Sequence, residues 1–206
     1  MWSRFLESDK FVVKGVKLGF MSFRIYTSDR HYRIQPFYDY INWSSNLKIF
    51  CSGRDSRKKQ ALYISEHQDL LNIYDVIDSE SKENVGIIKY HFGSWEIVDE
   101  NNNYFVVAKD SLLREIFSLR YYPYYIVDSA GKIFAKLQKD SPAFLPSVFS
   151  YTIDFSLDKR KLLDKRLALA VLILFILSSE RLGTLEKLKL YVHLKLQRMA
   201  QNRFWR

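Results

Sequence analysis

The sequence predicts a mainly β fold, a single closed antiparallel barrel of about twelve strands around a buried hydrophobic C-terminal helix, followed by an extra basic amphipathic helix. Three observations predict this fold. The 206 residues include 14 Tyr and 15 Phe but only 7 Gly and 4 Pro, and aromatic side chains favour strands over a Gly-rich nucleotide-binding architecture. Short apolar segments alternate with polar turn clusters. One unbroken apolar run follows them near the C-terminal end.

Strand-like segments occupy most of residues 11–156. Each is rich in Val, Ile, Tyr or Phe and is bounded by Asn, Asp, Ser or Gly, which are typical turn residues. The predicted strands are Phe11–Phe23, His31–Phe37, Leu47–Cys51, Ala61–Ser65, Leu70–Asp78, Val85–Phe92, Trp95–Asp99, Tyr104–Ala108, Tyr121–Asp128, Lys132–Leu137 and Val148–Phe155. Between two of them, Ser111–Leu119 is expected to form one or two helical turns.

A weak internal repeat supports a series of hairpins. The segments Tyr74–Asp78, Trp95–Asp99 and Tyr124–Asp128 share one pattern: an aromatic residue, any residue, two β-branched residues and an aspartate. A polar turn and another apolar strand follow each segment. We expect each aspartate to accept backbone hydrogen bonds in its turn. The alternative is that the three carboxylates form a catalytic or metal cluster.

The apolar run Leu167–Leu177 contains eleven residues without a polar side chain. A bilayer span needs about 20 apolar residues, whereas a run of about 10–14 is typical of a buried helix. Because this run is hydrophobic on every side, it needs a wall of protein around it, and the predicted strands supply one. Asp158 is expected to cap the helix, with Asp164 in its first turns. A short membrane insert over Leu162–Leu177 is the alternative.

The closing segment carries a family resemblance. Tyr151–Asp158, followed within a few residues by the apolar run, resembles the last strand and central helix of phospholipid scramblases, LURP-one-related proteins and, more distantly, tubby C-terminal domains. The hairpin from Tyr124 to Ala135 is similar to the family's penultimate hairpin. The resemblance covers about Tyr121–Ser179 and implies a twelve-stranded barrel around its helix.

The resemblance implies less about ligands than about fold. Scramblases are linked to calcium through an acidic segment here matched by Asp154 and Asp158, but the cations Lys159, Arg160 and Lys161 follow directly and oppose calcium binding. We therefore expect no metal site and no cofactor. Tubby domains bind phosphoinositide head groups through a basic surface pocket, which implies an anionic lipid as the ligand class.

The positive charge is concentrated in two places. The chain has a net charge of +9, and residues 180–206 carry more than half of it on a predicted amphipathic helix. A second basic cluster lies between two predicted strands. The candidate anionic-lipid-binding residues are Arg54, Arg57, Lys58, Lys59, Lys187, Lys195 and Arg198. Solubility alone is the other interpretation of this charge. We divide the chain into a barrel domain, 1–179, and a helical extension, 180–206.

No catalytic signature is present in the sequence. The four histidines and Cys51 have no metal-ligand spacing, and there is no nucleophile elbow or phosphate-binding glycine loop. The sequence therefore predicts a non-enzymatic module that binds anionic phospholipid at a membrane surface. The alternative is a soluble interaction or structural domain whose residues 180–206 dock a protein partner or dimerise. Nucleic acid is not expected as a partner. With no signal peptide or transmembrane span, we expect a cytoplasmic protein, either soluble or peripheral to a membrane.

Overall fold

The computed structural model describes residues 6–18, 20–27, 31–38, 45–52, 58–67, 72–91, 94–109, 123–140 and 148–178. The chain divides into two compact units, Met1–Val171 and Leu172–Arg206. The boundary between them falls inside a helix, residues 165–178, which we call the apolar helix. The predicted helical turns at Ser111–Leu119 and the predicted helix over 180–206 lie outside the described residues.

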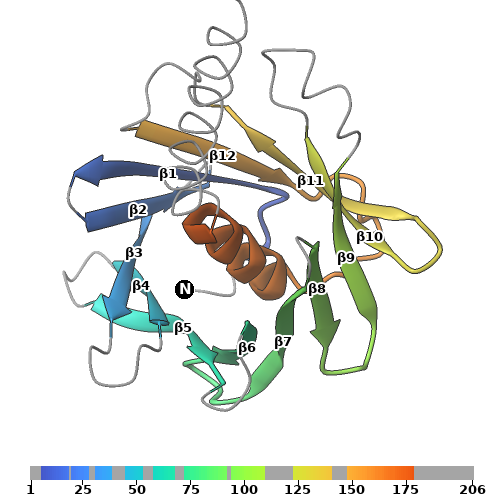
Figure 1. Ribbon diagram of the computed structural model, residues 1–206, viewed down its shortest axis with the longest axis horizontal. Coiled ribbons are helices and arrows are strands. Elements are labelled where there is room, and N and C mark those ends of the chain that lie inside the picture. Colours follow the sequence, from blue (N-terminus) through green and yellow to red (C-terminus); the bar gives the residue numbers. More distant parts are fainter. Residues whose placement is uncertain are drawn as a thin grey trace, which may run out of the picture. The chain divides into compact units, whose positions relative to one another are not determined.

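In the part of the chain that the structure describes, twelve antiparallel strands form the sheet (Figure 1). Their bounds are β1 Lys10–Leu18, β2 Phe20–Tyr26, β3 His31–Tyr38, β4 Ser45–Ser52, β5 Lys58–Glu66, β6 Ile73–Asp78, β7 Asn84–His91, β8 Ser94–Asp99, β9 Tyr104–Lys109, β10 Tyr124–Asp128, β11 Ile133–Lys139 and β12 Val148–Asp154. Consecutive strands pair with one another, and β1 also pairs with β12. The strand order is therefore that of a closed barrel. The predicted mainly β, antiparallel class is confirmed.

The predicted strand Phe11–Phe23 is wrong as a single element. The structure divides it into β1 and β2, which are separated in sequence by Gly19 alone and pair in register from Leu18 opposite Phe20 to Val12 opposite Tyr26. The apolar and β-branched residues run through both strands, so the hydrophobic pattern contains no gap. Glycine, which adopts turn conformations at little cost, is the single signal of the break.

The repeat pattern places its members on alternate faces of the sheet. In β8 the side chains of Trp95, Ile97 and Asp99 are buried, whereas the residues between them are half-buried. This alternation is the period of two expected of a pleated strand. In the other two repeats the first β-branched residue, Val76 or Ile126, is likewise fully buried. Asp78 is buried as well, whereas Tyr74, Tyr124 and Asp128 are half-buried.

The apolar helix begins with Asp164 as its N-cap. The Asp164 carboxylate accepts the amide of Arg166 at 2.8 Å, and its carbonyl accepts the amide of Ala168 at 3.1 Å. The predicted cap, Asp158, is instead bonded to the amides of Leu162 and Leu163, at 3.1 and 2.9 Å. Asp158 therefore fixes the turn before the helix, and a second aspartate caps the helix itself.

The first turns of the apolar helix, up to Val171, lie inside the ring of strands (Figure 1). Leu167, Ala168, Leu169, Ala170 and Val171 have no exposed surface. Leu172, Ile173 and Ile176, in the second unit, are also fully buried. The turn of helix from Leu167 to Val171 is thus buried on every side, as the apolar run predicted. No helix in the described part of the chain is long and apolar enough to cross a bilayer.

Gly86 in β7 lets the sheet approach the helix closely. A Cβ at this position would lie 2.4 Å from the Val98 carbonyl oxygen and 3.0 Å from Leu167 Cδ1. Gly86 also has a φ of +152° and lies at a bulge, where the register between β6 and β7 shifts. Only glycine fits this combination of backbone conformation and space.

Candidate anion-binding surface

The residues predicted to bind anionic lipid are not brought together by the described part of the structure. Arg54, Arg57, Lys187, Lys195 and Arg198 lie outside the described residues.

Lys58 and Lys59 begin β5, where their backbones are paired with Ser52 and Cys51 of β4. The structure describes the backbone of these two residues only. The predicted cluster therefore remains a prediction, and the described residues offer a different basic segment.

That segment is the connection between β12 and the apolar helix, residues 156–162, which we call the basic loop. Two aspartates fix its backbone. Asp154, the last residue of β12, accepts the amide of Ser156 at 2.9 Å. Asp158 accepts two amides from the end of the loop, and its carbonyl accepts the amide of Lys161 at 3.0 Å. Lys161 has a φ of 53°, so the loop is a defined turn.

The side chains of the basic loop combine positive charge with exposed apolar surface. Lys159, Arg160 and Lys161 are all exposed. Leu157 and Leu162, on either side of them, are 49% and 48% exposed, the highest values among the large hydrophobic side chains that the structure describes. Three adjacent cations are therefore bracketed by two leucines that reach into solvent.

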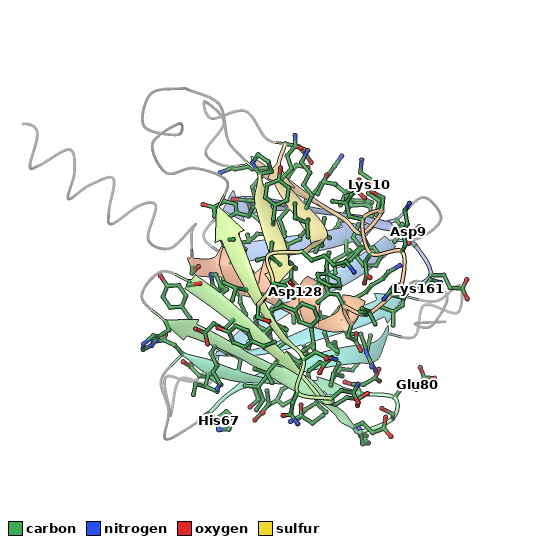
Figure 2. The ribbon with its side chains drawn as sticks, turned by 90° about the vertical axis from the view of Figure 1, so that its right-hand side faces the viewer. Asp9, Lys10, His67, Glu80, Asp128 and Lys161 are labelled. Carbon is green, nitrogen blue, oxygen red and sulfur yellow. The ribbon has the colours of Figure 1, made fainter. Side chains whose placement is uncertain are left out.

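The residues before β1 are bonded to the same region. The Asp9 carbonyl accepts the amide of Phe155 at 2.8 Å. Lys165, in the first turn of the helix, donates to the Ser8 carbonyl at 2.8 Å and to the Asp9 carboxylate at 3.0 Å. Figure 2 shows Asp9 and Lys161 along one edge of the view. These contacts hold the base of the basic loop between the first and last strands.

Asp154, just before the basic loop, lies opposite a lysine on each neighbouring strand. Lys10 of β1 and Lys136 of β11 are its cross-strand partners on either side. The hydrogen bond from the Ser156 amide, together with these two lysines, lowers the pKa of Asp154 in spite of some burial. Its carboxylate is thus ionised at neutral pH, and the positive charges of the two lysines contribute to this.

The three repeat aspartates act as turn acceptors, as predicted. Asp99 accepts the amides of Asn101 and Asn103 at 2.9 and 2.7 Å. Asp128 accepts those of Ala130 and Lys132, both at 2.9 Å. Among the described residues, no group of three His, Cys, Asp or Glu side chains is arranged to hold a metal ion. The hairpin interpretation of the repeat is therefore confirmed.

Asp78, the third repeat aspartate, has an additional partner in the helix. It accepts the amide of Glu80 at 2.9 Å, and Arg166 Nη1 lies 2.8 Å from its Oδ2. Arg166 also donates to Asp164 at 2.6 Å. Burial would raise the pKa of Asp78, but the hydrogen bonds from Arg166 and from the turn amides lower it. Hydrogen bonds to Asp164 and Asp78 raise the pKa of Arg166 against its partial burial. This network joins the helix start to the β6–β7 turn.

Comparisons of the chain with protein-family models, with curated proteins and with solved structures each found no match. In the sequence, Lys159, Arg160 and Lys161 argue against calcium and do not stand out as a site. The reason is that Leu157 and Leu162 have the same residue type as the buried leucines that follow. Only their position in a turn outside the sheet exposes them.

Proposed function

We propose that the protein is a non-enzymatic binding module that docks on anionic phospholipid surfaces through the basic loop. The observation that carries this proposal is the exposure of Leu157 and Leu162 on either side of three exposed cations. Apolar side chains flanked by basic ones suit the interface between acyl chains and anionic head groups. The net charge of +9 favours approach to such a surface.

The expected attachment is reversible. A basic side chain near an anionic membrane surface contributes about 1 kcal/mol, and this contribution falls with ionic strength because salt screens it. Two inserted leucines add a hydrophobic term that salt does not weaken. Because Asp158 already fixes the loop backbone, little conformational entropy is lost on docking.

The family resemblance supports the same proposal. We infer a scramblase-like, tubby-type barrel. The ladder that closes between β1 and β12 supports this inference, as do the fully buried residues from Leu167 to Val171 directly after the closing segment. Lipid transport across the bilayer is not part of the proposal. The alternative role, a soluble domain that recruits a partner through 180–206, depends on residues outside the described part of the chain.

Flotation of the full chain with vesicles tests the proposal. We expect binding to vesicles of phosphatidylcholine with phosphatidylserine, weaker binding at higher salt, and none to phosphatidylcholine alone. Replacing Lys159, Arg160 and Lys161 by Gln should weaken binding to the anionic vesicles at least about tenfold. Leu157→Ser combined with Leu162→Ser should weaken the binding that remains at high salt. Lys82→Gln, an exposed lysine in the β6–β7 turn, is the matched control.

Further variants distinguish the contribution of the basic loop to vesicle binding from that of the basic residues predicted from the sequence. Arg57→Glu and Lys195→Glu should weaken flotation if those segments also contact the membrane, and the loop variants should weaken it regardless. If the wild-type chain does not float with anionic vesicles at low salt, the lipid-binding function is excluded. The search would then turn to a protein partner. If the loop variants float like the wild type, the loop is not the contact.

A further inference from the structure

A second basic feature lies on the outer face of the sheet, on strands far from the basic loop in sequence. Lys14 of β1 and Arg24 of β2 are direct cross-strand partners. Arg24 is in turn the cross-strand partner of Arg33 in β3. The side chains of Lys14 and Arg24 are exposed, whereas their neighbours Val13 and Ile25 are fully buried. Both cations therefore lie on the outer face.

Placing two like charges directly opposite each other opposes folding. Cross-strand partners have Cβ atoms about 4.5–5.5 Å apart, and like charges at this separation are destabilising. Among the described residues, no ion pair involves Lys14 or Arg24. The second cross-strand partner of Lys14 is Ser150 of β12, which brings a hydroxyl and no charge.

Among the described residues, the strand positions nearest to Lys14 carry no carboxylate of their own. The positions that share a face with Lys14 are the residues two places along its own strand and the diagonal residues of the two neighbouring strands. These six positions hold Val12, Val16, Ser22, Tyr26, Val148 and Thr152. Asp140 is the acid next to this set, and it accepts a hydrogen bond from Thr152. Lys14 Nζ lies 5.7 Å from the centre of the Tyr26 ring, so an aromatic face borders the pair.

We propose that this outer face binds a phosphate group, with Lys14 and Arg24 as its charged ligands. The guanidinium of Arg24 can donate two parallel hydrogen bonds to phosphate oxygens. The ammonium of Lys14 supplies a second charge from the opposite strand, and the Ser150 hydroxyl supplies a donor beside it. A dianion bound between Lys14 and Arg24 attracts both cations, and this attraction offsets their mutual repulsion. The phosphate can belong to a soluble molecule or to a phosphomonoester head group.

The first experiment measures binding of inorganic pyrophosphate to the full chain by calorimetry, together with the melting temperature. We expect pyrophosphate to bind wild type and to raise its melting temperature. Arg24→Gln should weaken binding at least about tenfold. Lys14→Glu places opposite charges across the strands, so this variant should melt no lower than wild type and should bind no pyrophosphate. Lys82→Gln, which changes an exposed lysine of the β6–β7 turn outside both basic features, should bind like the wild type.

The second experiment separates the two sources of phosphate. Vesicles of phosphatidylcholine with phosphatidic acid, which has a phosphomonoester head group, are compared with vesicles of equal charge that contain phosphatidylserine. A preference for phosphatidic acid that Lys14→Glu abolishes assigns the site to a head group. Pyrophosphate binding without that preference assigns it to a soluble phosphate compound.

The inference is overturned if the wild-type chain binds no pyrophosphate, or if Lys14→Glu binds it as tightly as wild type does. Because the probe is soluble and the basic loop remains intact, its failure is independent of the flotation result.

Discussion

Asp78 binds both the backbone of its own turn and a side chain of the apolar helix. Its carboxylate bonds to the amides of its own turn and to Arg166. Its side chain is only 7% exposed, so its ionised form depends on these donors rather than on water. The aspartate position was predictable because the turn interaction is local, within two or three residues. Arg166 as a partner was not predictable, since 88 residues separate the two in sequence.

The lowered pKa of Asp78 predicts a stability change in acid. Its pKa is below the ordinary value of 3.8 in the folded protein. The carboxylate therefore stabilises the fold above pH 3.8, and this contribution is lost as the pH falls through the lower, folded-state pKa. Urea unfolding at neutral pH and at about pH 3 measures the free energy of unfolding.

Asp78→Asn should lower that free energy at neutral pH by about 2–3 kcal/mol, because Arg166 loses its buried partner. The variant should then lose less than the wild type on acidification. Glu80→Gln removes an exposed charge from the same turn as a control. Equal losses for Asp78→Asn and wild type would show that Asp78 does not carry the effect.

At the scale of elements, the contact between β7 and the apolar helix depends on one missing side chain. Gly86 removes a Cβ that would collide with the backbone of β8 and with Leu167. The strand itself was predicted from its Val and Ile residues. Neither the bulge nor the close approach was predicted, because both depend on which residues of other elements face Gly86.

Gly86→Ala should lower the free energy of unfolding by more than about 2 kcal/mol. The new methyl group would meet the Val98 carbonyl oxygen at 2.4 Å, and a backbone atom cannot move aside cheaply. Gly131→Ala is the matched control, since Gly131 has a φ of +78° but no atom within 4 Å of an added Cβ. It should cost only the conformational strain, about 1 kcal/mol. Urea unfolding of both variants checks the comparison, which fails if the two losses are equal.

The pairing of the strands determines which side chains are cross-strand neighbours, and the sequence alone does not show this. Arg24 is exposed, as an alternate residue of a strand beside the buried Ile25 would be, but the identity of its cross-strand neighbours depends on register. The predicted strand Phe11–Phe23 runs through Gly19 without a break. It therefore gives no sign that Lys14 and Arg24 lie opposite each other on two paired strands. The exposure of Leu157 and Leu162 was hidden for a similar reason, because a leucine pattern does not distinguish a turn from the start of a helix.

At the scale of the whole molecule, the sheet and the first turns of the helix share one interior. Phe11, Ile25, Ile64, Ile97 and Ile153 come from five strands and are all fully buried. Such an interior is expected to unfold cooperatively. The apolar run and the aromatic strands predicted this arrangement together, since neither can bury its apolar surface alone.

A charge inside this interior should abolish folding. Leu169→Asp buries an unpaired carboxylate at a position with no exposed surface, and the cost is comparable to the whole stability of a domain. Leu162→Asp places the same residue at a position that is 48% exposed and should remain folded. Circular dichroism and thermal melting distinguish the two. A cooperatively melting Leu169→Asp protein would contradict the buried position of the helix.

The pairing of β1 with β12 has a consequence for the order of events during translation. Lys10 meets its partner Asp154 only after 144 further residues have been added. Until then β1 and the growing end of the sheet both present unpaired backbone edges, which are prone to association with other chains. The residues that fill the interior emerge from the ribosome later still. We therefore expect the nascent chain to depend on chaperones until the apolar helix is made.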